Sequence, residues 1–255
     1  MKISLITVCY NSASTISDTF ESVLNQTYSD IDYVVVDGNS SDETVSIIKE
    51  YEQKFNGKMR WISEPDNGLY DAMNKGIQMS NGEIIGILNS DDYYHRNDVI
   101  EKVAMVFIEN KDIQAVFGDL RFVKTNNLDK TVRYYSSKYF SPWKFRFGFM
   151  PAHSTFFTYK EYFDKFGYYK YYYQIAADYE LLIRFLYIHK LKYKYLPFDF
   201  LKMRIGGRST KSLKNRIILN KEIVQGCKEN GIYTNMPILF MKYFFKIFEL
   251  FLKNQ

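Results

Sequence analysis

Several features that mark particular protein classes are scarce in this 255-residue sequence. Its two cysteines, Cys9 and Cys227, lie far apart, so we expect two buried, reduced thiols and a reducing compartment. Five prolines and 13 glycines exclude a collagen-like or low-complexity chain. The first residues, 1–5, lack a basic segment followed by a long apolar one, and they predict a strand rather than a signal peptide.

The signatures of several chemistries are also missing. Neither a G-x-G-x-x-G pattern nor a P-loop occurs, which argues against the usual dinucleotide binding and against P-loop phosphoryl transfer. The histidines His95, His153 and His189 show no metal-ligand spacing, and His189 is expected only to end a helix. The sequence shows no Ser/His/Asp or Cys/His signature of a protein nucleophile.

The composition that remains is that of a globular protein, with 46% hydrophobic and 25% charged residues and a mean hydropathy of −0.31. The net charge of +5 conceals an asymmetry between two halves. Residues 1–110 carry 8 basic and 18 acidic groups, whereas residues 111–255 carry 26 basic and 11 acidic groups. Basic residues interleaved with aromatics, as in 168–173, suit sugars, a membrane surface or nucleic acid.

The first half alternates the patterns of strands and helices. Strands are expected over 3–8, 33–36, 59–62 and 84–88, and helices over 14–27, from 41 or 42 to about 51, over 69–79 and over 98–109. This order predicts an α/β fold with a mostly parallel sheet and helices on both faces. Ligands bind such sheets at the carboxyl ends of the strands, so we expect Tyr10, Asp37 and residues 89–92 to face one crevice.

The second half has a different pattern, which adds strands to the same sheet. We expect a hairpin of 115–123 and 131–135, an aromatic loop or short helix over 142–149, strands over 153–158, 192–196 and 198–204, and helices over 176–189 and 213–228. The sequence contains no internal repeat and no Pro/Gly-rich linker. A single α/β domain with a helical extension is therefore predicted.

Two acidic groups are candidates for chemistry. Asp91 and Asp92 follow a buried strand, and adjacent carboxylates there suit a cation such as Mg²⁺ or Mn²⁺ that holds a diphosphate; a solvated turn with a helix cap is the alternative. Asp178 opens the helix near residue 176, where it is either a general base or a carboxylate favoured by the helix dipole.

Three further positions leave two interpretations open. Asp37 either accepts hydrogen bonds from a ribose or base, or forms a cap or Asx turn. His153 is a candidate for lining a site. The stretch 206–211 is either an exposed loop or a lid whose Arg208 or Lys211 closes over a diphosphate.

The C-terminal segment 236–253 is apolar except for one narrow stripe of Lys242, Lys246, Glu249 and Lys253. Its charges argue against a transmembrane span and favour an amphipathic helix in the membrane interface. The alternative is a helix that docks on the domain or on a partner subunit.

Four blocks together resemble family 2 glycosyltransferases with the GT-A fold. The blocks are Ser4–Asn11, Val34–Asp42, Glu64–Gly76 and Asn89–Asp92, and they occur in the expected order and spacing. The resemblance covers residues 1–210 and is firmest over 1–110. It implies a nucleotide-sugar-binding half over 1–110, an acceptor-side half over 111–210 and a separate extension over 211–255.

The family implies the inverting transfer of a sugar from a nucleotide sugar, with UDP-sugars as the default, to a hydroxyl of a glycan acceptor. Asp91 and Asp92 are implied to bind a divalent cation, although Asn89 departs from the first acid of the D-x-D pattern. Asp178 is implied to be the base, and His153 is placed on the acceptor side. The implied donor-binding residues are Thr7, Tyr10, Asp37, Lys75, Asp91 and Arg208.

The charge split and the family together suggest a lipid-linked acceptor in bacterial surface polysaccharide synthesis, such as O-antigen or capsule. We therefore expect a cytoplasmic protein, with the inner face of the plasma membrane as the specific hypothesis. Three alternatives stand beside this interpretation. The first is an inactive nucleotide-sugar-binding protein. The second is a nucleotidyltransferase, although the phosphate-binding loop of such enzymes is missing from this sequence. The third is a nucleic-acid-binding module, which the acidic first half argues against.

Overall fold

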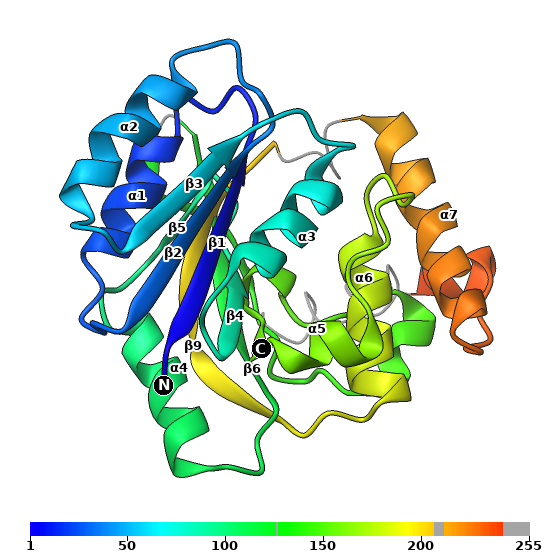
Figure 1. Cartoon of the computed structure of the whole chain (residues 1–255). Helices are drawn as coiled ribbons and strands as arrows, with labels where there is room; N and C mark the ends of the chain where they lie inside the picture. The colour runs from blue at the N-terminus through cyan, green and yellow to red at the C-terminus, as the bar shows by residue number, and fades with distance from the viewer. Residues whose placement is uncertain (126, 207–211, 242–255) are drawn as a thin grey trace.

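The computed structural model describes residues 1–125, 127–206 and 212–241. One nine-stranded sheet runs through both halves of the chain in the order β3-β2-β1-β4-β8-β6-β9-β5, with β7 paired to β6 (Figure 1). The predicted α/β fold with helices on both faces is confirmed. The sheet is parallel in the first half and mixed in the second.

The first half is built from regular strand–helix units. Its elements are β1 (Ile3–Cys9), α1 (Ile16–Leu24), β2 (Ile31–Asp37), α2 (Thr44–Lys54), β3 (Met59–Ser63), α3 (Leu69–Met79) and β4 (Ile84–Ile87). All three pairings, β3 with β2, β2 with β1 and β1 with β4, are parallel. The carboxyl ends of these strands therefore meet at one edge, as the sequence predicts.

Alternation along the strands explains why helices cover both faces. Ile3 and Leu5 of β1 pack in one core with α1, α2 and α4 (Val99–Glu109). Ile6 and Val8 point to the other face, where they join α3 and α6 (Ala177–Leu182). Figure 1 shows α1 and α2 on one side of β1–β3 and α3 on the other. Such a strand is buried on both faces, which is why it reads as a continuous apolar run.

The second half completes the sheet with less regular pieces. Its remaining elements are β6 (Ala115–Lys124), β7 (Asn127–Tyr135), the short helices η1 (Pro142–Phe147) and η2 (His153–Thr155), β8 (Phe157–Tyr159), α5 (Glu161–Phe166), η3 (Ile183–Ile188), β9 (Tyr193–Arg204) and α7 (Leu213–Glu229). The short strand β5 (Asp92–Tyr94), at the end of the first half, pairs with β9. The predicted hairpin is confirmed as antiparallel β6 and β7. β8 joins the halves by pairing antiparallel with both β4 and β6.

Two expectations for this half were wrong in detail, and one short strand at the end of the first half was missed. The stretch 153–158 begins as a 3₁₀ turn, because Thr155 folds back to donate to the carbonyl of Ala152. The two strands expected on either side of Pro197 are a single strand, β9, because the register with β6 shifts there and a proline is tolerated at such an irregularity. The short strand β5 was not predicted, since three residues are too few to show a pattern.

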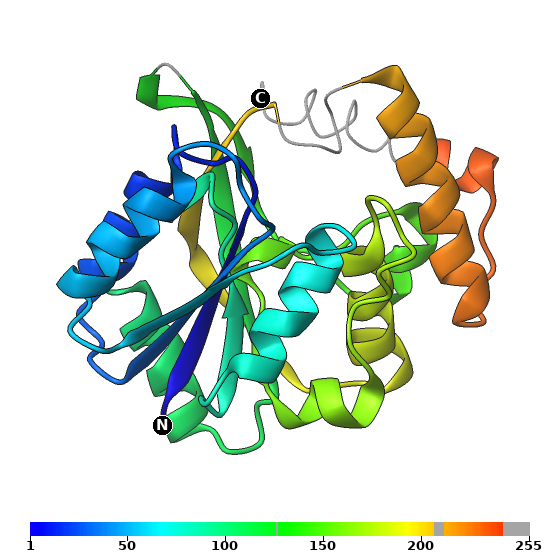
Figure 2. The same cartoon turned by 45° about the horizontal axis from the view of Figure 1, so that its top comes forward.

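The C-terminal part lies beside α6. α7 packs against α6, at the end of the molecule away from β1–β3 (Figure 2). Residues 236–241 are helical, and the rest of the predicted amphipathic helix, 242–253, lies outside the described residues. In the described ranges, no helix is both long and apolar enough to cross a membrane. Cys9 and Cys227 are both buried and unpaired, as expected.

Candidate active site

The strand ends of the first half and several segments of the second surround a cavity of about 1260 Å³. Tyr10, Gly38 and residues 89–92, from the ends of β1, β2 and β4, all line it. The crevice predicted from the strand order is therefore present, although Asp37, which was expected to face it, does not line it. From the other half come residues of β7, η2, β9 and the turn that leads into α6.

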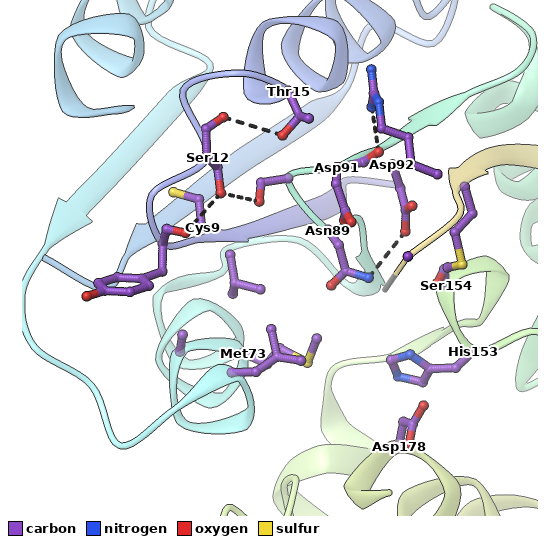
Figure 3. Close-up of a pocket in the computed structure, with 18 of the residues that line it drawn as sticks. Cys9, Ser12, Thr15, Met73, Asn89, Asp91, Asp92, His153, Ser154 and Asp178 are labelled. Carbon is purple, nitrogen blue, oxygen red and sulfur yellow. Dashed lines mark hydrogen bonds between the residues drawn. The ribbon is translucent and has the colours of Figure 1, made fainter. Parts of the chain in front are cut away.

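One wall of the cavity is acidic. Asn89, Asp91 and Asp92 lie together in Figure 3, and the Asn89 amide donates to Oδ2 of Asp92 at 3.3 Å. Asp92 is 1% exposed, and burial together with the neighbouring Asp91 raises the pKa of Asp92 well above its usual range. Burial also raises the pKa of Asp91. The two carboxylates therefore resist carrying full charge together unless a cation compensates them.

Two buried oxygens in this wall are left without a partner. The Oδ1 atoms of Asn89 and Asp92 accept no hydrogen bond from any residue that the structure describes. A buried oxygen without a donor is costly, and both atoms are of the type that Mg²⁺ and Mn²⁺ prefer. Over the described ranges, no group of three or more His, Cys, Asp or Glu side chains is arranged to hold a metal ion by itself.

The acidic turn is held in place by the last residue of β9. Arg204 donates to the backbone carbonyl of Asp91 at 2.5 Å and forms an ion pair with Asp18 of α1. The hydroxyl of Thr19, also in α1, donates to the carbonyl of Asp92 at 2.8 Å. Sequence reasoning missed Arg204, because this contact spans more than one hundred residues and no local pattern signals it.

The opposite wall carries the predicted base. Asp178 and His153 lie side by side across the cavity from Asn89 (Figure 3). Oδ1 of Asp178 accepts the N–H of Tyr179 at 2.8 Å and lies 3.5 Å from the Tyr70 hydroxyl. Burial raises the pKa of Asp178, although the nearby His153 lowers it in part. The His153 ring is fixed by a 2.7 Å hydrogen bond between its Nε2 and the Tyr169 hydroxyl, and burial lowers its pKa.

The mouth of the cavity is shaped by two loops that bind each other. Tyr10 is 65% exposed there. The next residue, Asn11, adopts a left-handed conformation with φ of 50°, and its Oδ1 accepts the backbone N–H of Ser41 at 2.9 Å. The hydroxyls of Ser12 and Ser90 are 2.8 Å apart and tie the first loop to the acidic turn. These contacts place Tyr10 at the rim.

Two predicted donor-binding residues lie behind the cavity wall. Thr7 is fully buried, because it shares the face of β1 that carries Leu5, and its hydroxyl is 2.8 Å from that of Tyr33. The carboxylate of Asp37 is also fully buried and accepts the Ser40 N–H at 2.9 Å and the Ser63 hydroxyl at 2.6 Å. The structure thus gives Asp37 the hydrogen-bonded turn that the sequence left open as an alternative.

Of the remaining two predicted donor-binding residues, Lys75 is also absent from the cavity lining. Lys75 forms a 2.7 Å ion pair with Glu64 and donates to the carbonyl of Pro65 at 2.9 Å, so it fastens α3 to the preceding loop. Arg208 lies outside the described residues, as does Lys211. The structure therefore brings together Tyr10, Asp91, Asp92, His153 and Asp178 from the predicted set.

Comparison with curated proteins finds glycosyltransferases. A PGL/p-HBAD biosynthesis glycosyltransferase of Mycobacterium bovis (strain BCG / Pasteur 1173P2) is 31% identical over 123 residues, which is 48% of this chain and 48% of that protein. An uncharacterized glycosyltransferase of Nostoc sp. is 33% identical over 132 residues, or 52% of this chain and 40% of that protein. This chain spans about half the length of the curated relatives it matches.

Solved structures share the fold at low sequence identity. S. aureus TarS 1–349 in complex with UDP-GlcNAc gives a TM-score of 0.69 with 18% identity over 89% of this chain and 66% of that chain. The mannosyltransferase PcManGT from Pyrobaculum calidifontis, in complex with GDP-Man and Mn²⁺, gives 0.64 with 18% identity over 93% of this chain and 66% of that chain. These likenesses confirm the expected GT-A-like fold. The sequence model described as "Glycosyl transferase family 2" matches residues 4–180, more than half of the chain, and the chain therefore belongs to that family.

Proposed function

We propose that this chain is an inverting glycosyltransferase that moves a sugar from a nucleoside-diphosphate sugar, in the first instance a UDP-sugar, to a hydroxyl of a glycan acceptor. The observation that carries the proposal is the placement of Asp91 and Asp92 across one cavity from Asp178 (Figure 3). The volume of about 1260 Å³ exceeds the ~300–1000 Å³ typical of a pocket for one small ligand, so there is room for two reactants.

Asn89, Asp91 and Asp92 fit a divalent cation. The unpartnered Oδ1 atoms of Asn89 and Asp92 and the carboxylate of Asp91 are hard oxygen donors beside the cavity. Mn²⁺ or Mg²⁺ bound there would offset the negative charge that develops on the leaving diphosphate. The structure of PcManGT with GDP-Man and Mn²⁺ supports this assignment, as does the raised pKa of both carboxylates without a cation.

The oxygen of the acceptor hydroxyl attacks the anomeric carbon from the face opposite the diphosphate, and Asp178 takes the proton of that hydroxyl. One C–O bond forms, the bond from the anomeric carbon to the diphosphate oxygen breaks, and its electron pair leaves with the diphosphate. Burial raises the pKa of Asp178 and so makes its carboxylate a stronger base. His153, fixed by Tyr169 beside this carboxylate, contacts the acceptor.

The donor nucleotide occupies the side of the cavity near Tyr10, whose exposed ring offers a stacking surface at the mouth. Thr7, Asp37 and Lys75 support that side from behind the wall through the hydrogen bonds and ion pair already described. The role of Arg208 at the diphosphate stays a prediction.

The acceptor is proposed to be lipid-linked, and the protein to act at the cytoplasmic face of the membrane in surface polysaccharide synthesis. The basic second half supports this proposal, and contact through 236–253 is part of it. We expect the full chain to co-sediment with anionic vesicles in low salt and a chain that ends at residue 235 to bind less. Equal binding by the two chains would remove the segment from the proposal.

A thermal-shift series tests the donor and the cation together. We expect one nucleoside diphosphate to raise the melting temperature in the presence of Mn²⁺ and a much smaller shift after chelation. Asp91→Ala and Asp92→Ala should abolish the Mn²⁺-dependent part. Asp112→Ala is the matched control, since its side chain is 87% exposed and lies outside the cavity lining. The proposal fails if no nucleotide shifts the protein, or if both cavity variants respond as the control does.

A further inference from the structure

A carboxylate from α7 holds the chain just before the helix that carries Asp178. Oε1 of Glu222 accepts the N–H of Gln174 at 2.7 Å, and Oε2 accepts the N–H groups of Ile175 and Ala176, each at 2.9 Å. Glu222 is 9% exposed. Three short hydrogen bonds to one buried carboxylate make a rigid contact, because charge-assisted hydrogen bonds are stronger than neutral ones.

This contact replaces a cap that the local sequence does not provide. Ala176 is the N-cap residue of α6, and it has no side chain that can accept a hydrogen bond from the helix start. Alanine is among the weakest N-cap residues, so the entry into α6 is poorly fixed by its own sequence. Glu222 supplies a negative group at this end from another helix, where the helix dipole also favours it.

The same backbone is held on its other side by α3. The Tyr70 hydroxyl donates to the carbonyl of Ile175 at 2.5 Å and lies 3.5 Å from Oδ1 of Asp178. Gln174, Ile175 and Asp178 all line the cavity. The segment 174–176 is thus clamped between Glu222 and Tyr70, and its position sets where Asp178 meets the acceptor.

α7 lies close to α6 at this point for a steric reason. Gly226, one turn after Glu222, faces Glu180 of α6, and a Cβ at Gly226 would lie 3.4 Å from the Cβ of Glu180. Asn230 adds a 3.1 Å hydrogen bond from its amide to Oε1 of Glu180. These contacts seat α7, although α7 lies beyond residues 4–180, the part of the chain that matches the family model.

We propose that Glu222 is a positioning residue, which fixes the segment 174–176 and thereby holds Asp178 in register with the acceptor hydroxyl. The inference rests on the proposed function, in which Asp178 is the base. A misplacement of about 1 Å at a reacting group lowers a rate by about 100-fold, so loss of the clamp reduces turnover rather than donor binding.

The test compares three variants of the full chain. Glu222→Ala removes both oxygens that accept the three backbone N–H groups, whereas Glu222→Gln keeps one oxygen, which can still accept some of them. Glu229→Gln changes the other acid of α7, which binds side chains such as Lys170 and Gln225 rather than the backbone of 174–176, and serves as the matched control. We expect kcat to fall by about 10- to 100-fold in Glu222→Ala, less in Glu222→Gln, and within about twofold of wild type in the control, with nucleotide affinity unchanged throughout.

The pH profile separates positioning from loss of folded protein. Asp178 faces His153, Tyr70, Tyr169 and Tyr135, and its pKa is raised by burial. Loosening the clamp admits water, so the acidic limb of kcat moves to lower pH in Glu222→Ala. If the variant merely contained less folded protein, kcat would fall by the same factor at every pH and the acidic limb would stay at the same pH. Unchanged kcat in Glu222→Ala, or a scaled but unmoved profile, overturns the proposal.

Amide hydrogen exchange tests the clamp independently of any transfer assay. We expect the amides of residues 174–176 to exchange at least tenfold faster in Glu222→Ala than in the Glu229→Gln control. Unchanged exchange overturns the clamp even if the enzyme is active. Faster exchange in Glu222→Ala, combined with a wild-type chain that transfers no sugar, would leave the clamp in place and point instead to a failure of the proposed function.

Discussion

The two halves of the chain supply opposite walls of one cavity, and they do so by different structural means. Residues 1–90 place Tyr10, Gly38 and Asn89 at the ends of parallel strands, where a regular strand–helix order brings them together. The second half places His153 and Asp178 on a 3₁₀ turn and at a helix start, and packing between distant segments fixes both. Strand topology brings the acidic wall together and Arg204 of β9 then secures it, whereas the position of the candidate base, Asp178, depends on tertiary contacts between distant segments.

The sharpest test of this division is Asp178→Asn. The change removes the proposed base from one wall and leaves the other intact, so we expect transfer to fall by about 10²–10⁴-fold and nucleotide binding to stay within about twofold. In wild type, kcat should rise with pH through a pKa above the ordinary 3.8 of an aspartic acid, because burial raises that pKa. Steady-state kinetics and nucleotide titration measure both. Unchanged turnover removes Asp178 as the base.

A second test addresses the junction of the two halves. A Cβ at Gly86 of β4 would lie 2.2 Å from the Phe157 ring of β8, so we expect Gly86→Ala to destabilise the fold by about 1–3 kcal/mol. At about 2–4 °C per kcal/mol, calorimetry resolves this loss. Glu83→Ala, at an exposed position beside β4, is the control. Two separate melting transitions in Gly86→Ala would show that the halves unfold independently, against the single sheet described here.

The smallest expected effect lies on the surface of the first half. The Arg96 guanidinium, with Lys102, lowers the pKa of Asp98 to about 2, so Asp98 stabilises the fold above its unfolded pKa near 3.8 and loses this contribution as the pH falls toward 2. Asp98→Asn keeps a good N-cap for α4 and removes the charge. We expect a loss of at most about 1 kcal/mol at pH 7 and a smaller one at pH 3, measured by urea unfolding. An equal loss at both pH values would assign the effect to something other than charge.

The same division explains what the sequence could and could not reveal. The first four strands were predicted to within two residues at each end, because runs such as Tyr33–Val36 are apolar and bounded by turn residues. Asp91 and Asp92 stood out as adjacent acids after a buried strand. At Asp178 the residues alone left two interpretations open, since an acid in the first turn of a helix is ordinary, and only the family resemblance favoured the base.

Long-range contacts account for what was missed. Arg204 and Glu222 bind backbone atoms of distant segments. Because every residue has the same backbone groups, the sequence of those segments gives no sign of these contacts. Thr7 and Asp37 were assigned to the donor from the family pattern, yet alternation along β1 and β2 turns both side chains into the protein. Alternation along the strand was available from the sequence and would have placed Thr7 on the face of β1 that carries Leu5 and packs against α1 and α2.

The pairing of β5 with β9 has a consequence for the order in which the protein matures during synthesis. Asp92 pairs with Met203, and Arg204 binds the carbonyl of Asp91, so the acidic turn is completed by residues made more than one hundred positions later. Chains emerge from the ribosome N-terminus first, at about 5–20 residues per second. A nascent chain therefore displays β1–β4 for several seconds before its acidic turn is secured, and we expect cation binding by arrested chains to begin only once residue 204 has cleared the exit tunnel.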